Sequence, residues 1–166
     1  MDPLRLSAEP ITAAAFAAYG EVIETGGQQH VLINEGKCKR FTDLATVDVV
    51  DGRAGLSLFQ SDLRPLPYLC TLLERHPLGS QCFVPMSEAT WLIIVAPDED
   101  GAPGAISAFV ARPGLAVNIA RNTWHGVLAP VIGSGLFAVI DRIGNGANLE
   151  EHPLARPVLI DVPKAG

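Results

Sequence analysis

Short apolar segments separated by glycine and proline set the strongest limit on how this chain can fold. The 166 residues include 16 Gly and 13 Pro, and the segments between them are rich in β-branched and large apolar side chains. Such runs, bounded by turn residues, are typical of strands that follow one another at short spacing. We therefore expect an all-β sandwich or barrel rather than a parallel α/β sheet. The expected strands cover residues 21–23, 30–33, 46–50, 55–60, 68–75, 81–86, 90–96, 105–111, 115–119, 125–129 and 135–142.

One helix is expected near the N-terminus, over residues 12–20. Thr12 can cap it, a run of alanines favours it, and Gly20 can end it. The last segment, residues 144–166, is rich in proline, and we expect an arm that packs across the body or across a partner.

Composition favours one folded domain over residues 1–166. Hydrophobic residues make up 48% and charged residues 18% of the chain, which argues against extended disorder, and the length suffices to bury a core. The formal net charge of −6 argues against nucleic acid or an anionic membrane surface as a partner. An acidic protein that binds an anion must do so through a few locally placed arginines.

The cysteines and the N-terminus favour a cytoplasmic protein. Cys38, Cys70 and Cys82 are odd in number and lack paired metal spacing, so a disulfide framework is not expected and a reducing compartment fits. The N-terminus does not resemble a secretion signal, and the longest apolar run, residues 91–97, is too short to cross a bilayer.

Residues 74–81, with the sequence ERHPLGSQ, form the most informative stretch. If the segment before the turn is a strand, Glu74 and His76 project from the same face because they are two residues apart. The Pro and Gly of the turn allow the chain to reverse, which brings Gln81 back alongside. Further along, the stretch RNTWH ends at His125, the only other histidine in an apolar context. These four side chains together would suit a cation.

The spacing resembles the two metal motifs of cupin-type β-barrels. The first motif, His-x-His followed after three or four residues by Glu, is matched with Glu for the first His and Gln for the Glu. The second, Pro-x-Gly-x-x-His, is matched by residues 120–125 with Ala for Pro and Asn122 for Gly, and Asn tolerates left-handed backbone. Imidazole and oxygen ligands suit Mn, Fe, Ni, Co or Zn. The alternative is that backbone groups satisfy both histidines and that Glu74 pairs with Arg75 or Arg121.

Several segments together resemble the ureidoglycolate lyase family of allantoin catabolism. They are FAAYGEVI (16–23), RFTDL (40–44), ERHPLGSQ with the FVP that follows, RNTWH (121–125) and IDR (140–142). The resemblance implies a cupin-like double-stranded β-barrel (jelly roll) with a short N-terminal helix, usually a homodimer, that splits (S)-ureidoglycolate into glyoxylate and urea. It also implies a possible divalent metal, with Ni, Mn or Zn as candidates.

Carried over residue by residue, the resemblance predicts the site. Glu74, His76, Gln81 and His125 fall on the central pocket as metal ligands, and Glu74 is either the fourth ligand or the base. The catalytic set predicted in this way is Glu74, His76, His125 and Arg121. The residues predicted to bind substrate are Arg75, Asn122, Trp124, Arg40 and Arg142.

Simpler roles compete with several of these assignments. Arg75 lies between Glu74 and His76 and should face the other side of the strand, and Trp124 can serve packing alone. Arg40 and Arg142 can each pair with a nearby aspartate. Members of the family often carry a further histidine where this chain has Ala120 and Gly126, so neither of those positions can supply a base or ligand here.

Two other functions stay open from the residues alone. A hydrolase that acts on the same substrate would release ammonia and would need an activated water at the ureido carbonyl. A cupin-like binding module with a vestigial pocket would show no turnover, and the Glu and Gln substitutions in the first motif motivate that alternative.

Overall fold

The computed structural model describes residues 1–164, and the regular secondary structure of this part of the chain is almost entirely β-strand. The predicted domain over residues 1–166 and the predicted C-terminal arm both include residues 165 and 166, which lie outside the described part. The elements are β1 (Leu4–Ser7), β2 (Glu9–Pro10), α1 (Ala13–Phe16), β3 (Gly20–Ile23), β4 (Val31–Ile33), β5 (Cys38–Arg40), β6 (Arg53–Gln60), β7 (Tyr68–Arg75), β8 (Gln81–Pro85), β9 (Ala89–Ala96), β10 (Asp98–Glu99), β11 (Ala102–Pro103), β12 (Ser107–Ala111), β13 (Ala116–Ile119), β14 (Trp124–His125), β15 (Ala129–Gly133), β16 (Leu136–Ile143) and β17 (Glu150–Asp161).

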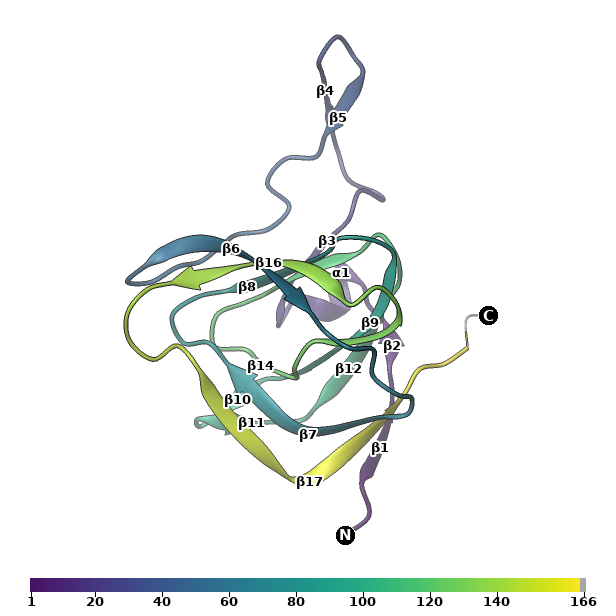
Figure 1. Cartoon of the computed structure of the whole chain (residues 1–166), viewed down its shortest axis with the longest axis vertical. Helices are drawn as coiled ribbons and strands as arrows, with labels where there is room; N and C mark the ends of the chain where they lie inside the picture. The colour runs from purple at the N-terminus through teal and green to yellow at the C-terminus, as the bar shows by residue number, and fades with distance from the viewer. Residues whose placement is uncertain (165–166) are drawn as a thin grey trace.

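Most strands belong to two sheets. The larger sheet has eight strands, in the order β1-β17-β7-β14-β9-β12-β2, and β15 pairs with β9 beside this path. The smaller sheet has five strands, in the order β3-β13-β8-β16-β6. In Figure 1, β6, β16 and β8 of the smaller sheet lie across the interior from β7 and β17 of the larger one. The predicted all-β class is confirmed, and the sheets form a nearly closed, barrel-shaped body.

Strand β9 is the centre of the hydrophobic core. All of its residues are buried, and successive side chains alternate between two apolar clusters. Trp91, Ile93 and Val95 belong to the cluster between the sheets, whereas Leu92 and Ile94 belong to a second cluster on the other face. Because both faces are covered, the strand reads in the sequence as a continuous apolar run.

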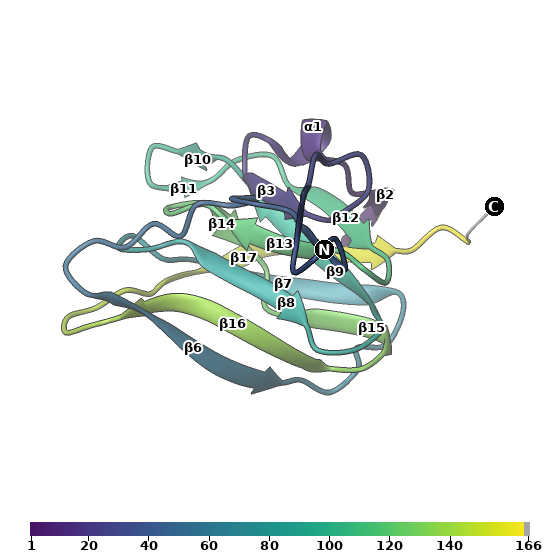
Figure 2. The same cartoon turned by 90° about the horizontal axis from the view of Figure 1, so that it is seen from above.

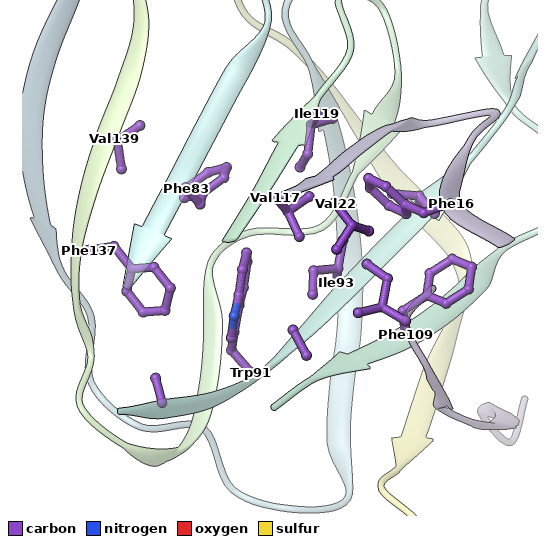
Figure 3. Close-up of a cluster of buried hydrophobic side chains, with 14 residues drawn as sticks. Phe16, Val22, Phe83, Trp91, Ile93, Phe109, Val117, Ile119, Phe137 and Val139 are labelled. Carbon is purple, nitrogen blue, oxygen red and sulfur yellow. The ribbon is translucent and has the colours of Figure 1, made fainter. Parts of the chain in front are cut away.

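Aromatic side chains connect the two sheets across the first cluster, as Figure 3 shows. The ring of Trp91 on β9 lies 5.1 Å from that of Phe137 on β16 and 6.0 Å from that of Phe83 on β8, measured between centroids. These contacts fix the spacing of the sheets, and they therefore set the space available to the polar side chains described below.

The N-terminal helix is shorter than the sequence predicts. It covers Ala13–Phe16, and the Thr12 hydroxyl accepts a hydrogen bond from the Ala15 amide at 3.1 Å, as expected of a cap. Gly20 begins β3, where a Cβ atom would collide with the carbonyl of Asn118. The glycine thus allows the chain to leave the helix and join the smaller sheet at close range. Figure 2 shows α1 on the opposite side of the molecule from β6 and β16.

Residues 46–50, which the sequence predicts to be a strand, form only an isolated bridge between Val49 and Gly79. Their backbone bonds to the turn after β7 instead. The amide of Ser80 donates to the carbonyl of Asp48 at 2.9 Å. The strand prediction was wrong here because the segment bonds to a turn and does not pair with a neighbouring strand.

The predicted C-terminal arm is largely a strand, β17, which pairs antiparallel to β7 along much of its length. Its register shifts between Pro153 and Val158, and this irregularity accommodates prolines within a paired strand. The sequence did not predict this strand because prolines are uncommon inside paired strands.

Strands β4 and β5 form a hairpin that projects from the barrel, as Figure 1 shows. Its apolar residues Val31, Leu32 and Ile33 are exposed. The one helix within residues 1–164, α1, falls far short of the length needed to span a lipid bilayer.

Candidate active site

The polar site lies between the two sheets, where β7 meets β14. Glu74 on β7 pairs directly with His125 on β14. Neighbouring side chains alternate across the sheet, so Glu74 and His125 face the smaller sheet while Arg75 and Trp124 face away from it. His125 is only 2% exposed. The pairing thus places a carboxylate and an imidazole next to each other in a largely buried position.

His76 follows β7 and is held by its surroundings on both sides. Its Nδ1 donates to the carbonyl of Asn148 at 2.8 Å, and its own carbonyl accepts from the amide of Asn122 at 3.1 Å. Asn122 has left-handed backbone, with a φ of 65°, as the sequence predicts for the position where the cupin motif has Gly. The two motifs are therefore joined through one backbone hydrogen bond.

Both imidazoles present a free ring nitrogen. The Nδ1 of His125 donates to the carbonyl of Gly126 at 2.9 Å, as Nδ1 of His76 does to Asn148. Because a carbonyl only accepts, each neutral ring carries its hydrogen on Nδ1 and its lone pair on Nε2. Both Nε2 atoms are buried and lack a hydrogen-bond partner within residues 1–164. The ring centroids lie 5.2 Å apart.

Gln81, the first residue of β8, brings an amide from the smaller sheet. Its Nε2 donates to a carboxylate oxygen of Asp141 on β16 at 3.2 Å. This contact fixes the orientation of the amide and leaves Oε1, which is buried and without a partner in the described part of the chain. Gln81 lines the same pocket as Glu74, so its free acceptor lies on the wall of that pocket.

The donor set fits a divalent metal. One ligand-type atom from each of Glu74, His76 and His125 lies within 4.8 Å of the others, close to the separation of about 3 to 4 Å between ligands of one ion. Three buried acceptors without partners would each be satisfied by a cation, whereas left alone each is costly. The alternative, that backbone groups satisfy the histidines, accounts for Nδ1 of each ring and leaves both Nε2 atoms unexplained.

Burial shapes the protonation of the two groups on the paired strands. It lowers the pKa of His125 to about 4, so that the ring is neutral at neutral pH. It raises the pKa of Glu74, an effect that the nearby His76 partly opposes and Glu151 reinforces. A carboxylate with a raised pKa is a better proton acceptor, and a neutral imidazole is a better ligand.

A pocket of about 490 Å³ opens beside these residues. The segment that the sequence predicts as one strand over 125–129 is divided, because β14 ends at His125 and β15 begins at Ala129. Val127 and Leu128, which lie between the two strands, line the pocket. The complete lining is Phe59, Gln60, Ser61, Asp62, Arg64, Glu74, Gln81, Phe83, Val127 and Leu128.

Arg75 and Trp124, both predicted to bind substrate, lie on the outer face of the larger sheet. The Arg75 guanidinium bonds to Asp98 at 2.7 Å and to Glu150 at 2.6 Å, and its carbon lies 4.5 Å from the centre of the Trp124 ring. The Trp124 indole also donates to Asp98, at 2.9 Å, and lowers the pKa of that carboxyl together with Arg75. The structure does not bring these two residues to the pocket, because alternation along β7 and β14 turns them outward.

The other predicted arginines also lie elsewhere. Arg121 pairs with Asp48 at 3.2 Å and borders a separate hollow near Glu21. Arg142 is buried, and its guanidinium donates to three backbone carbonyls of nearby loops. Arg40 lies on the projecting β4–β5 hairpin. Asn122 contributes its backbone to the site, as described above, and its side chain is exposed.

Three residues near the site were missed by sequence reasoning. Asn148 holds His76 through its carbonyl and the Leu78 amide through its side chain, and Asp141 orients Gln81. Arg64 lines the pocket. The IDR segment pointed toward Asp141, but no spacing in the sequence connects Asn148 or Arg64 with the two histidines.

Comparison with known proteins points to one family. A family model described as ureidoglycolate lyase matches residues 3–161. A ureidoglycolate lyase from Rhodobacter capsulatus is 52% identical over 158 residues, which cover 95% of this chain and 98% of the relative. One from Chelativorans sp. is 45% identical, covering 96% of this chain and 98% of the relative, and "Ureidoglycolate lyase 2" from Rhizobium meliloti is 43% identical, covering 94% and 97%.

Among solved structures, a dTDP sugar isomerase from Desulfovibrio desulfuricans G20 covers 82% of this chain and 83% of its own, at 15% identity and a TM-score of 0.40. That likeness is too weak to support an argument. The family match and the relatives, by contrast, extend over nearly the whole sequence. On that basis, the chain belongs to the ureidoglycolate lyase family.

Proposed function

We propose that this chain cleaves (S)-ureidoglycolate to glyoxylate and urea, as a step of allantoin degradation, in the pocket beside Glu74. Membership of the family supports the reaction. The observation that carries the location is the set of three buried acceptors without partners, Nε2 of His76, Nε2 of His125 and Oε1 of Gln81. The two histidines group with the carboxylate of Glu74, and Gln81 lines the same pocket as Glu74.

The substrate defines what the site must do. One carbon of ureidoglycolate bears a hydroxyl, a carboxylate and a ureido nitrogen. Breaking the carbon–nitrogen bond requires removal of the hydroxyl proton as the aldehyde forms, and delivery of a proton to the departing urea nitrogen. No outside nucleophile takes part.

Glu74 is the proton acceptor that the geometry supports best. It lines the pocket, and its raised pKa brings it closer to the range in which a carboxylate exchanges protons efficiently. His125 is a poor candidate for the acid, because its low pKa keeps it neutral. Once protonated, Glu74 can return the proton to the leaving nitrogen, so that one carboxylate serves both transfers.

The residues that would hold a divalent metal are His76 and His125 through Nε2 and Gln81 through Oε1, with Glu74 as a possible fourth ligand. When bound, an ion such as Ni, Mn or Zn would act as a Lewis acid that makes the substrate hydroxyl more acidic and orients the substrate carboxylate. Asp141 and the carbonyls of Asn148 and Gly126 hold the ligands in place in the manner of outer-shell partners.

The test is to incubate purified protein with ureidoglycolate and to measure urea, ammonia and glyoxylate against the spontaneous decay of the substrate. Urea with glyoxylate supports the lyase, ammonia indicates the hydrolase, and no turnover above decay indicates a binding module. Elemental analysis, with urea release before and after chelation, tests the metal. Turnover that persists in protein from which all metal has been removed would contradict the metal proposal and leave the proposed lyase activity intact.

We further propose that the protein is a homodimer with the cupin-like jelly-roll connectivity, and that it works in the cytoplasm. Three consecutive apolar residues of the β4–β5 hairpin are exposed, as are Leu56 and Leu58 on β6, at 71% and 62%. A lone hairpin is marginally stable, so cover from a second copy would stabilise it. Light scattering on the purified chain tests the dimer, and a monomeric mass at micromolar concentration contradicts it.

The location in the cytoplasm is supported by the cysteines. The three free cysteines suit a reducing compartment.

A further inference from the structure

We infer that Arg64 binds the carboxylate of the substrate. This inference rests on the proposed function and deepens it, because it assigns the charged end of the substrate to one side of the pocket. Arg64 lines the same pocket as Glu74 and Gln81, and it is the one basic residue of that lining in the described part of the chain.

The Arg64 side chain is uncommitted. Its Nε atom is buried and has no hydrogen-bond partner, and none of the ion pairs within residues 1–164 involves it. A guanidinium presents several donors in a planar fork that matches a carboxylate. A buried donor without a partner is costly, and a bound carboxylate would remove that cost.

The backbone of Arg64 is fixed although its side chain is free. Its amide donates to the carbonyl of Pro130 on β15 at 2.7 Å. This bond ties the loop between β6 and β7 to the strand that follows Val127 and Leu128, two other residues of the pocket wall. The guanidinium is thus attached to the rim of the pocket and does not belong to a loose surface loop.

The charge of the pocket requires such a residue. Glu74 and Asp62 both line it, and each carboxylate repels an anionic substrate. The arginines predicted for this role from the sequence are occupied elsewhere, Arg75 by two carboxylates and Arg121 by Asp48. Among the residues that line the pocket, Arg64 is therefore the one whose charge offsets this repulsion.

The test compares the two products as inhibitors, because glyoxylate carries the carboxylate and urea is neutral. In Arg64→Met, the KM for ureidoglycolate and the inhibition constant of glyoxylate should each rise roughly 10- to 100-fold, the usual range for losing a charge-assisted hydrogen-bonded pair. The inhibition constant of urea should change by less than about twofold. Arg64→Lys should show a smaller loss, because it keeps the charge and loses the fork.

Arg53→Met is the matched control, because Arg53 is exposed at the start of β6 and outside the pocket lining. Equal weakening of glyoxylate and urea, or unchanged glyoxylate inhibition in a folded Arg64→Met, overturns the inference. If Arg64→Met does not fold, the same comparison of products in Arg64→Lys decides. If the wild type releases no urea, the proposed function fails, and calorimetric binding of glyoxylate to wild type and variant still tests Arg64 by itself.

Discussion

The two faces of the β7–β14 pair differ in how their polar groups are satisfied. On the inner face, Glu74 and His125 lie beside buried acceptors that have no partner. On the outer face, Arg75 is bonded to two carboxylates and packs against Trp124. These residues are neighbours in the sequence, so one step along a strand separates a site available for a ligand from a network that is already complete.

This difference distinguishes function from stability. Each unpartnered buried acceptor costs about 1 to 3 kcal/mol, so the inner face weakens the fold until a ligand occupies it. On the outer face, Arg75 and the Trp124 indole already have partners within residues 1–164, so their contacts act within the protein. Substitutions on the inner face should therefore change activity, and those on the outer face should change the free energy of unfolding.

The largest effect is expected from removing an inner imidazole. His125→Ala should lower kcat/KM for ureidoglycolate by about 10²- to 10⁴-fold, because a ligand and a neighbour of the proton acceptor are lost together. Initial rates of urea release, corrected for spontaneous decay, measure the effect. His152→Ala is the control, because His152 contacts the outer side of the Trp124 ring, with centroids 5.8 Å apart. Equal losses in the two variants would contradict the distinction between the faces.

The same imidazole should make stability depend on pH. Because burial lowers the folded-state pKa of His125 from 6.5 to about 4, the unfolded chain binds a proton more readily between these values. Stability should therefore fall as the pH decreases from about 6.5 to 4, by up to about 3 kcal/mol. Urea denaturation of chelator-treated protein at several pH values measures this loss. His125→Gln should show a smaller loss over that window, and an identical curve would contradict the assignment.

Alternation and turn chemistry made the inner face predictable. Glu74 and His76 were expected on one side of a strand, and the structure brings both near His125. Asn122 was expected to adopt left-handed backbone and does, with a φ of 65°. The same alternation predicted that Arg75 faces outward. These inferences need only the local period of a strand and the conformational preferences of single residues.

The missed residues depend on contacts between distant segments. Arg64 reaches the pocket because its amide bonds to Pro130, and Asn148 holds His76 from a loop far along the chain. No local pattern encodes such pairings. In residues 46–50, local β-propensity pointed to a strand, but Asp48 bonds to the turn that contains Ser80. Propensity describes which structures a segment can adopt, and its tertiary partners decide which of them forms.

A smaller effect, on stability alone, is expected from the outer face. Arg75→Met keeps most of the apolar stem but removes both ion pairs, so the free energy of unfolding should fall by about 1 to 2 kcal/mol. This range allows for solvent screening, because the Asp98 and Glu150 side chains are 40% and 48% exposed. The kcat/KM should stay within about twofold of wild type. A large loss of activity with unchanged stability would place Arg75 in the substrate site after all.

The smallest effect concerns the acidic partner of that network. The Trp124 indole, followed by Arg75, lowers the folded-state pKa of Asp98 below its usual 3.8, so Asp98 contributes stability that is present above about pH 4 and lost as the pH falls through the folded-state value. This loss of stability occurs at lower pH than the loss caused by His125, because His125 takes up its proton before Asp98 does as acid is added. Asp98→Asn should remove this acid-side loss, and Trp124→Phe should reduce it, both measured as the difference in unfolding free energy between pH 4 and pH 3. If Asp98→Asn loses as much unfolding free energy between pH 4 and pH 3 as the wild type does, the bonds from Trp124 and Arg75 do not stabilise the charge on Asp98. The contrast between the two faces then rests on the inner groups alone.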